Sequence, residues 1–241
     1  MKYKNITELK NIHQGEDIWV INAGSSMNFV NNSFFDKKIT IGINQVYRLF
    51  RCDYVVMKDL GEQSRFGESI QELKNSNTKL LFSRYHAGNH NPTPGTAMRP
   101  DGKNIPEYSD NFYVFDHSNN GSYKKPDGSL DLDVIGSEDR IIAIRSTFTS
   151  ALHISAYFGA KNIMVCGVDS GKIDGKSYMD DYTQKHWISG GNNPGTEQWL
   201  GGIQPLNIQV RDKIKEVYDC NIYSLNPFLN FKLDGNTYEP F

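Results

Sequence analysis

Two stretches of the chain place small and hydroxylated residues where a helix is expected to start. The first, Ala23-Gly24-Ser25-Ser26, directly follows the apolar run 17–22, and the second, residues 146–150, opens a helical pattern that extends to Tyr157. The N–H groups of a helix start carry partial positive charge and suit an anion such as a phosphate. We therefore predict a nucleotide site that contains these residues: Asn22, Gly24, Ser25, Ser26, Ser146, Thr147, Thr149 and Ser150.

Polar residues at the ends of two expected strands extend this site. Asp169 follows the apolar run 162–167, and Asn44 follows the run 38–43. Ligands of open α/β sheets sit beyond the carboxyl ends of strands, so both side chains are predicted to contact the nucleotide. Each has an ordinary alternative, since Asp169 could cap a helix or loop and Asn44 could be a turn residue.

The glycine-rich segment 170–202 carries two side chains suited to catalysis, and we expect it to form a lid that orders over ligand. A histidine with an ordinary pKa of ~6.5 can accept a proton at neutral pH. His186 is therefore the best-placed candidate for the base that deprotonates an acceptor hydroxyl. The sequence around His186 would also suit a surface helix. Tyr178 could donate a hydrogen bond to a departing phosphate, or it could simply pack within the segment.

Two pairs of residues could be metal ligands, but neither pair favours a metal. Asp180-Asp181 could hold a divalent cation through oxygen ligands, yet adjacent acids on a polar loop are more often only solvated. His86 and His90 could chelate a metal only on a helix, which the nearby glycine and proline disfavour. We therefore predict no metal site.

Short, continuous apolar runs predict strands that are buried on both faces. They occur at residues 17–22, 38–43, 53–57, 79–82, 112–115, 162–167 and 221–225. Helices are expected at residues 62–73, 146–158 and 208–218, with Gly159 ending the second. The predicted fold class is α/β, with a Rossmann-like, mostly parallel sheet and helices on both faces.

Residues 1–241 are expected to form a single domain, because a chain of this length can bury one large core. Irregular insertions are predicted at about 84–111 and 116–138, where Pro, Gly and Asn are frequent and no periodicity is present. The polar residues 1–16 are expected to be a lead-in with a short helix near residues 6–12.

The composition, with 38% hydrophobic and 22% charged residues and a formal net charge of -2, is that of a globular protein. No basic run is present, which argues against a nucleic-acid partner. The three cysteines form no Cys-x-x-Cys pair and are expected to be reduced, buried thiols. Neither a signal peptide nor an apolar run of ~20 residues is found, so a soluble, cytoplasmic protein is expected.

Four segments resemble, in order and spacing, the bacterial sialyltransferases of glycosyltransferase family 42. They are VINAGSSM near the N-terminus, GINQ at the second expected strand, GAKNIMVCGVDS and CNIYSLNP. They also resemble the related motility-accessory-factor group and the 6-hydroxymethylpterin pyrophosphokinase-like proteins that share its core. The similarity covers the sheet and not the two long insertions.

The resemblance implies roles for residues that bind the donor. It puts Gly24, Ser25 and Ser26 at the nucleotide phosphates and Asn44 beside the nucleotide or the donor sugar. Residues 146–150 would lie against the base and ribose.

The resemblance also implies catalytic roles. Arg145 would face the acceptor or the donor carboxylate, and Tyr178 matches a lid tyrosine that assists the departing phosphate. Ala23 stands where the sialyltransferases have asparagine, and their general-base histidine is absent before the last helix. His186 is the nearest histidine to that position, so it is the candidate base.

The favoured function is transfer of a sugar, of the CMP-linked acidic class such as sialic acid, to an acceptor hydroxyl of a surface glycan. No metal or other cofactor is expected, and the partners are the nucleotide sugar and the glycan acceptor. A lipid-linked acceptor would bring the protein to a membrane surface, and an oligomer is left open.

Two other functions stay open. The first is a metal-dependent pyrophosphokinase of the pterin type; that group accommodates Ala23 but carries paired aspartates after the third strand, where this chain has Asp59 alone. The second is a catalytically inactive module that binds a nucleotide or a glycan, which would agree with the absent family histidine.

Overall fold

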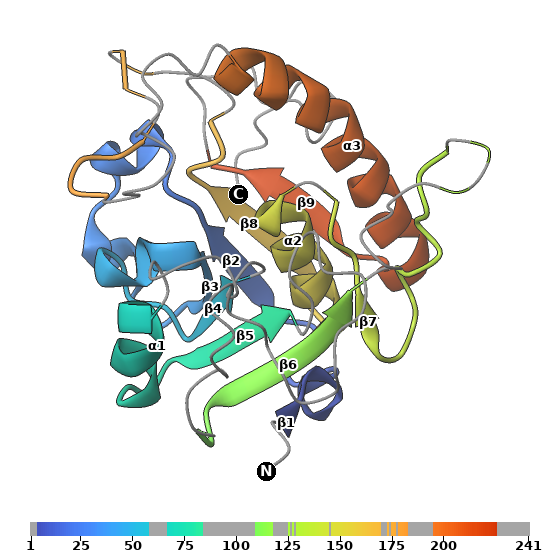
Figure 1. The fold of residues 1–241 in the computed structure, drawn as a ribbon, viewed down its shortest axis with the longest axis horizontal. Helices are drawn as coiled ribbons and strands as arrows, with labels where there is room; N and C mark the ends of the chain where they lie inside the picture. Colours follow the sequence, from blue (N-terminus) through green and yellow to red (C-terminus); the bar gives the residue numbers. More distant parts are fainter. Residues whose placement is uncertain are drawn as a thin grey trace.

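The computed structural model (Figure 1) describes residues 4–57, 67–83, 109–117, 125, 127, 129–144, 146–169, 173, 175–176, 178–182 and 195–225. Its strands are β1 (Lys4–Asn5), β2 (Asp17–Ile21), β3 (Ile39–Ile43), β4 (Tyr54–Met57), β5 (Lys79–Ser83), β6 (Phe112–His117), β7 (Arg140–Ile141), β8 (Asn162–Cys166) and β9 (Asn221–Ser224). Its helices are α1 (Gly67–Lys74), α2 (Thr147–Tyr157) and α3 (Gly195–Tyr218), with the short 3₁₀ helices η1 (Ile6–Leu9), η2 (Ser25–Phe29), η3 (Asn32–Phe35) and η4 (Asn44–Arg48).

The described strands form one sheet in the order β1-β6-β5-β4-β3-β2-β8-β9, with β7 paired to β6. Every pairing between these strands is parallel. Each predicted strand is present, because continuous apolar runs suit a sheet that is covered on both faces. The predicted α/β class with a mostly parallel sheet is therefore confirmed.

Successive side chains of strands such as β2 and β5 enter two different apolar clusters. On β2, Ile18 and Val20 belong to the cluster that α2 and α3 cover, whereas Trp19 and Ile21 belong to the cluster that η2, η3, η4 and α1 cover. This alternation follows from the two-residue period of a strand. Helices therefore cover both faces, as predicted.

The chain changes direction across the sheet between β2 and β8. From β2 it proceeds through β3, β4, β5 and β6 toward one edge, and β8 and β9 lie on the other side of β2. Parallel crossovers are right-handed, so connections that run in opposite directions must cover opposite faces, as the two clusters require. Open α/β sheets bind ligands at such a switch point, outside the carboxyl ends of the strands.

Helix α3 begins earlier than predicted, at Gly195 rather than near residue 208. The last residues of the predicted lid, 195–202, are therefore helical. Gly201, Gly202 and Pro205 disfavour a helix, so local propensity does not indicate the earlier start. Helix propagation from a well-packed segment is easier than nucleation, and the buried Val210 and Ile214 anchor that segment.

The N-terminal residues form more than a polar lead-in. Ile6 and Leu9 of η1 are buried, and β1 pairs with β6 at the edge of the sheet.

All three cysteines are buried and free, as predicted. Within the described part of the chain, no helix has the length and apolar character that crossing a bilayer requires.

Candidate functional site

The turn after β2 is bound to the end of β8 at the switch point. The Asn22 N–H donates to the Cys166 carbonyl over 2.9 Å, and the Gly24 N–H donates to the Gly167 carbonyl over 2.8 Å. A Cβ on Gly24 would lie 2.4 Å from the Gly167 oxygen, so this approach requires glycine. The Asn22 side-chain oxygen accepts a hydrogen bond from the Ala23 N–H, and this bond also stabilises the turn.

Asp169 holds the start of η2. Its carboxylate is 5% exposed, and it accepts from the Ser26 N–H over 2.7 Å and from the Ser26 hydroxyl. A negative group therefore already lies where the partial positive charge of the helix start would attract a phosphate. Contacts of Ser26 and Asp169 with a nucleotide stay predictions, and they would require this pair to open.

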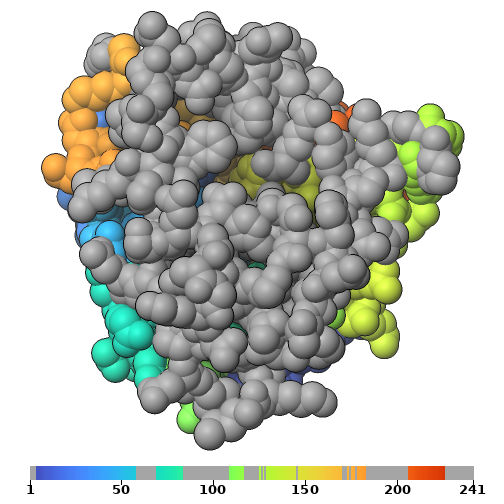
Figure 2. Space-filling model, in the orientation of Figure 1, coloured from blue at the N-terminus to red at the C-terminus, as the bar shows by residue number. Residues whose placement is uncertain are grey.

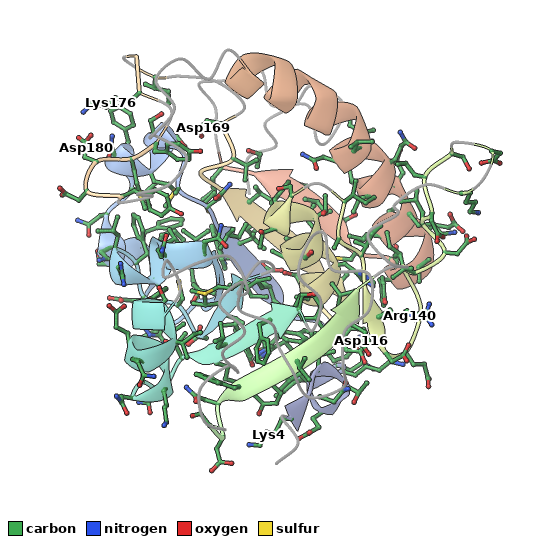
Figure 3. All side chains as sticks on the ribbon, in the orientation of Figure 1. Lys4, Asp116, Arg140, Asp169, Lys176 and Asp180 are labelled. Atoms are coloured by element: carbon green, nitrogen blue, oxygen red, sulfur yellow. The ribbon has the colours of Figure 1, made fainter. Side chains whose placement is uncertain are left out.

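The segment around Lys176 and Met179 closes over the same turn. The Ser25 hydroxyl donates to the Lys176 carbonyl over 2.6 Å, and the Met179 N–H donates to the Ala23 carbonyl over 2.9 Å. In the space-filling view, the orange surface of the described residues between 173 and 182 lies against blue surface from the N-terminal part of the chain (Figure 2). Asp169 lies near this segment, far from Asp116 at the β6–β7 end of the sheet (Figure 3).

Tyr178 directly precedes Met179, whose N–H bonds to Ala23 beside the switch point, and the residue is 39% exposed. The ring stacks on Tyr182, with 5.7 Å between the ring centroids. Burial of part of the side chain raises the pKa of Tyr178 above its usual range. Its phenol is therefore neutral at pH 7 and can donate a hydrogen bond.

Asn44 lies at the carboxyl end of β3 with a left-handed backbone, at φ 55°. Asparagine tolerates this conformation better than most residues. The side chain is half-buried, and no hydrogen bond of its amide is found within the described residues. The amide N–H groups and the amide oxygen of Asn44 can therefore all bond to a ligand.

The start of α2 differs from the start of η2. Ser146 caps the helix by accepting from the Phe148 N–H over 3.1 Å, and the first turn contains no acidic residue. Thr147 and Ser146 are half-buried. Because α2 returns the chain to the parallel strand β8, it runs antiparallel to the strands and begins at their carboxyl edge. Both predicted helix starts therefore lie at one edge of the sheet, on opposite faces.

Two of the predicted α2 ligand contacts are already used inside the protein. Thr149 and Ser150 are fully buried, and their hydroxyls bond to the backbone of Ile144 and Ile142. Both side chains therefore face the protein interior and not solvent. Contact of these two hydroxyls with a nucleotide stays a prediction.

His153 lies one turn further along α2 and is fully buried. Its Nδ1 accepts from the Ile142 N–H over 3.0 Å, so Nε2 carries the proton and donates to the Tyr218 hydroxyl over 3.1 Å. Burial lowers the pKa of His153 from 6.5 to about 3. The sequence alone gave this residue no role. In the structure it joins α2 to Ile142, in the segment before the helix, and to Tyr218 of α3.

Asn207 of α3 is a second residue that sequence reasoning missed. Its side chain is 3% exposed, and its Oδ1 atom is enclosed without any hydrogen-bond partner. An enclosed acceptor of this kind is rare and costs about 1–3 kcal/mol. One asparagine in a helical segment carries no signal in the sequence that would single it out.

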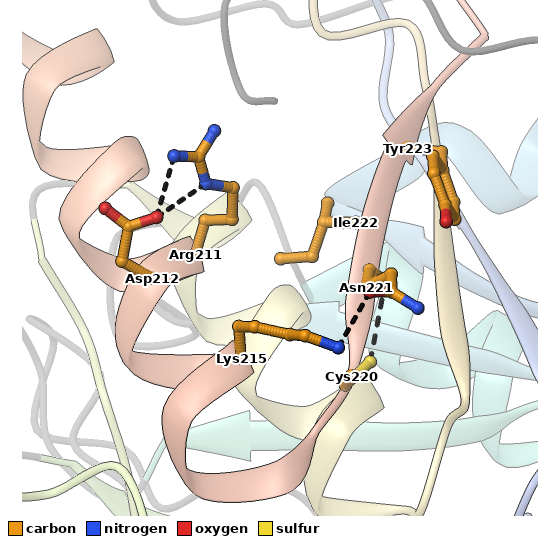
Figure 4. A pocket seen from close by; sticks show the side chains of 7 residues that line it. All are labelled: Arg211, Asp212, Lys215, Cys220, Asn221, Ile222 and Tyr223. Carbon is orange, nitrogen blue, oxygen red and sulfur yellow. Dashed lines mark hydrogen bonds and ion pairs between the residues drawn. The ribbon is translucent and has the colours of Figure 1, made fainter. Parts of the chain in front are cut away.

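A separate hollow lies between α3 and the edge strand β9 (Figure 4). Its charged groups are paired with each other or with nearby residues, since Arg211 bonds to Asp212 and Lys215 bonds to Asp219 and Asn221. It lies on the outer side of β9 and contains none of the predicted site residues. We therefore place the candidate site at the switch point.

The predictions for Arg145, His186 and Asp59 lie outside the described residues. Within the ranges that the structure describes, no three His, Cys, Asp or Glu side chains gather as a metal site would require.

Comparison with known proteins gives no relative: no family profile, no curated protein and no solved structure matches the chain.

Proposed function

We propose that the protein is a glycosyltransferase that moves a sugar from a nucleotide donor, of the CMP-linked acidic class, to an acceptor hydroxyl. The observation that carries the proposal is the gathering of polar groups at the carboxyl edge beside the β2–β8 switch point. Asn44 and the start of α2 lie at this edge, and Tyr178 directly precedes Met179, which bonds to the turn after β2. The proposal also rests on the segments that resemble glycosyltransferase family 42.

In this proposal the donor phosphate is held by the N–H groups at the start of α2, whose first turn contains no acidic residue. The η2 start serves instead as a rigid wall, because Asp169 already satisfies Ser26. Asn44 binds the donor sugar through its amide, which bonds to no other described residue. Helix N–H groups and a phenol supply the electrostatic stabilisation of the phosphate, so the scheme assigns no metal.

Bond cleavage leaves negative charge on the departing nucleotide phosphate. The neutral Tyr178 hydroxyl donates a hydrogen bond to that oxygen, which lowers the barrier without placing a full charge in a partly buried position. A base removes the acceptor proton as the new glycosidic bond forms. His186 is the candidate for that base.

A thermal-shift panel of CMP, CDP, UDP, GDP and ATP, with and without magnesium, tests the nucleotide class. A ligand present at a hundred times its Kd stabilises by about 2.7 kcal/mol, which such a panel detects. Stabilisation by CMP without metal is the expected result. Stabilisation by ATP only with magnesium would favour the pyrophosphokinase, and no response would favour an inactive module.

Variants then test the roles of individual groups in sugar transfer from a CMP-linked donor. Tyr178→Phe removes only the hydroxyl, and a loss of about 10- to 100-fold in kcat is expected. Asn44→Ala is expected to raise KM for the donor, while Asn75→Ala, whose amide bonds to Gln71 at the end of α1, serves as the matched control. Unchanged transfer in both Tyr178→Phe and Asn44→Ala would refute this placement of the donor.

A further inference from the structure

The unpaired oxygen of Asn207 lies at the same edge of the sheet as the proposed donor site. From Tyr218 back to Asn207, α3 rises about 16 Å, while β9 advances about 13 Å from Asn221 to Leu225. Because α3 runs antiparallel to β9, Asn207 reaches the level of Leu225, whose N–H bonds to Val165 near the end of β8. Asn207 therefore lies at the carboxyl ends of the strands.

Asn207 also faces inward. It precedes Val210 by one helical turn, and Val210 and Ile214 on the same face of α3 are fully buried against the core that α2 shares. Helices α2 and α3 are neighbours that run in the same direction, since both return the chain to parallel strands (Figure 1). The hydrogen bond between His153 and Tyr218 joins the later turns of α2 and α3. Because α3 extends further back from this bond than α2 does, Asn207 lies beyond the first turn of α2.

A nucleotide whose phosphate is bound at the start of α2 can extend its base toward β3 or toward α3. The β3 side holds Asn44, which the proposed function assigns to the donor sugar. The α3 side holds an amide oxygen that lacks a donor and is enclosed, so a base reaches it only after the groups around it have separated. Satisfying an enclosed acceptor is favourable, whereas bringing a second acceptor against it is unfavourable.

We propose that Asn207 binds the base of the nucleotide, with Oδ1 accepting a hydrogen bond from the exocyclic amino group of cytosine. Uracil presents a carbonyl oxygen at the same position, so it would meet the amide oxygen without a proton between them. The expected preference for CMP over UMP is about 10- to 100-fold. This inference rests on the proposed function, because it takes the phosphate position from it.

Calorimetric titration of the full chain with CMP and with UMP tests the inference in four proteins. These are the natural sequence, Asn207→Leu, Asn207→Asp and Gln209→Leu, the last being an exposed position on the same helix. Asn207→Leu is expected to reduce the CMP preference to about threefold or less, while Asn207→Asp keeps an acceptor and retains the preference. Gln209→Leu is expected to leave both Kd values unchanged.

Urea unfolding of the same proteins separates a binding role from a structural one. Leucine has a similar size and needs no partner, so Asn207→Leu is expected to keep or raise the urea midpoint. A CMP preference that survives in a folded Asn207→Leu variant would overturn the inference and leave the proposed function standing. Equal affinity of the natural protein for CMP and UMP would also overturn it, whereas binding of neither nucleotide would remove the proposed function itself.

Discussion

The starts of η2 and α2 look alike in sequence but differ in the structure. Both place serines and other small residues at the carboxyl edge of the sheet, beside the β2–β8 switch point. At η2, the Asp169 carboxylate accepts from Ser26 and fills the position of an anion. At α2, Ser146 caps the helix and no acid lies in the first turn.

The difference shows that a helix start is an anion site only when no internal anion is present. A phosphate near η2 would meet the charge of Asp169 in a partly dry environment, where repulsion is strong. The same carboxylate instead joins two segments that are far apart in the chain. We therefore regard η2 as the rigid side of the edge and α2 as the side open to a ligand.

The largest expected effect concerns the contact that makes the η2 side rigid. Gly167 has a φ of 69°, and a Cβ there would lie 2.2 Å from the Asn22 oxygen. Gly167→Ala is therefore expected to destabilise the protein by about 3 kcal/mol or more, from backbone strain and overlap together. Urea unfolding followed by circular dichroism measures the loss.

Gly15→Ala is the matched control for this substitution. Gly15 also has a positive φ, of 81°, but nothing lies within 4 Å of the added Cβ. Only the backbone term remains, about 1 kcal/mol. Equal losses in Gly15→Ala and Gly167→Ala would show that the close approach of the two turns does not matter.

The Asp169–Ser26 pair gives the next largest effect. Asp169→Asn replaces one acceptor by an amide nitrogen that cannot accept, so about 2 kcal/mol of stability is expected to be lost. A double-mutant cycle with Ser26→Ala should return a coupling energy of about 1 kcal/mol. Ser25→Ala, which loses only a neutral bond to the Lys176 carbonyl, should show no coupling with Asp169→Asn.

On the α2 side, acid should destabilise the protein through His153. Its folded pKa of about 3 lies below the value of about 6.5 in an unfolded chain, so the unfolded state binds the extra proton between these values. Above pH ~6.5, His153 takes nothing from the free energy of unfolding. Below that pH, the free energy of unfolding falls by about 1.4 kcal/mol per pH unit. Urea titrations at pH 7, 6 and 5 measure it, and His153→Gln should make the dependence shallower by one proton. An unchanged slope in the variant would show that another group titrates.

The smallest expected effect is the loss of the α2 cap. Ser146→Ala removes the acceptor for the Phe148 N–H and should lower stability by about 1 kcal/mol. Ser146→Asp restores an acceptor and should recover the stability. It also adds a negative charge at this helix start, so it should weaken CMP binding. Calorimetry on both variants would show whether α2 is the open side, and tighter CMP binding in Ser146→Asp would reverse our assignment.

The sheet could be predicted from the sequence because its signal is local. The runs that became β2, β3 and β8 are continuous and apolar, which a sheet buried on both faces requires. The end of α2 was also readable, because Gly159 follows the helix and adopts a φ of 91°, which favours glycine. Helix α3 is longer than predicted, and the low helix propensity of Gly201 and Pro205 gives no local signal for its first turns.

The site could be predicted only in part, because its contacts are not local. The serines were identified, but their hydrogen-bond partners were not, since 143 residues separate Ser26 from Asp169. Thr149 faces the segment before α2 rather than solvent, a direction that residue type does not determine. Asn207 depends on the register of α3 over β9, which the sequence does not state.

The buried cysteines offer a way to observe local opening. Burial raises the pKa of Cys166 above its usual range and that of Cys220 to about 12, so neither thiol reacts until its surroundings separate. Cys166 is the last residue of β8 and directly precedes the Gly167 contact. Cys220 directly precedes β9, at the amino ends of the strands. The labelling rate of each thiol therefore reports breathing of a different end of the sheet. A nucleotide that binds at the switch point should protect Cys166 far more than Cys220.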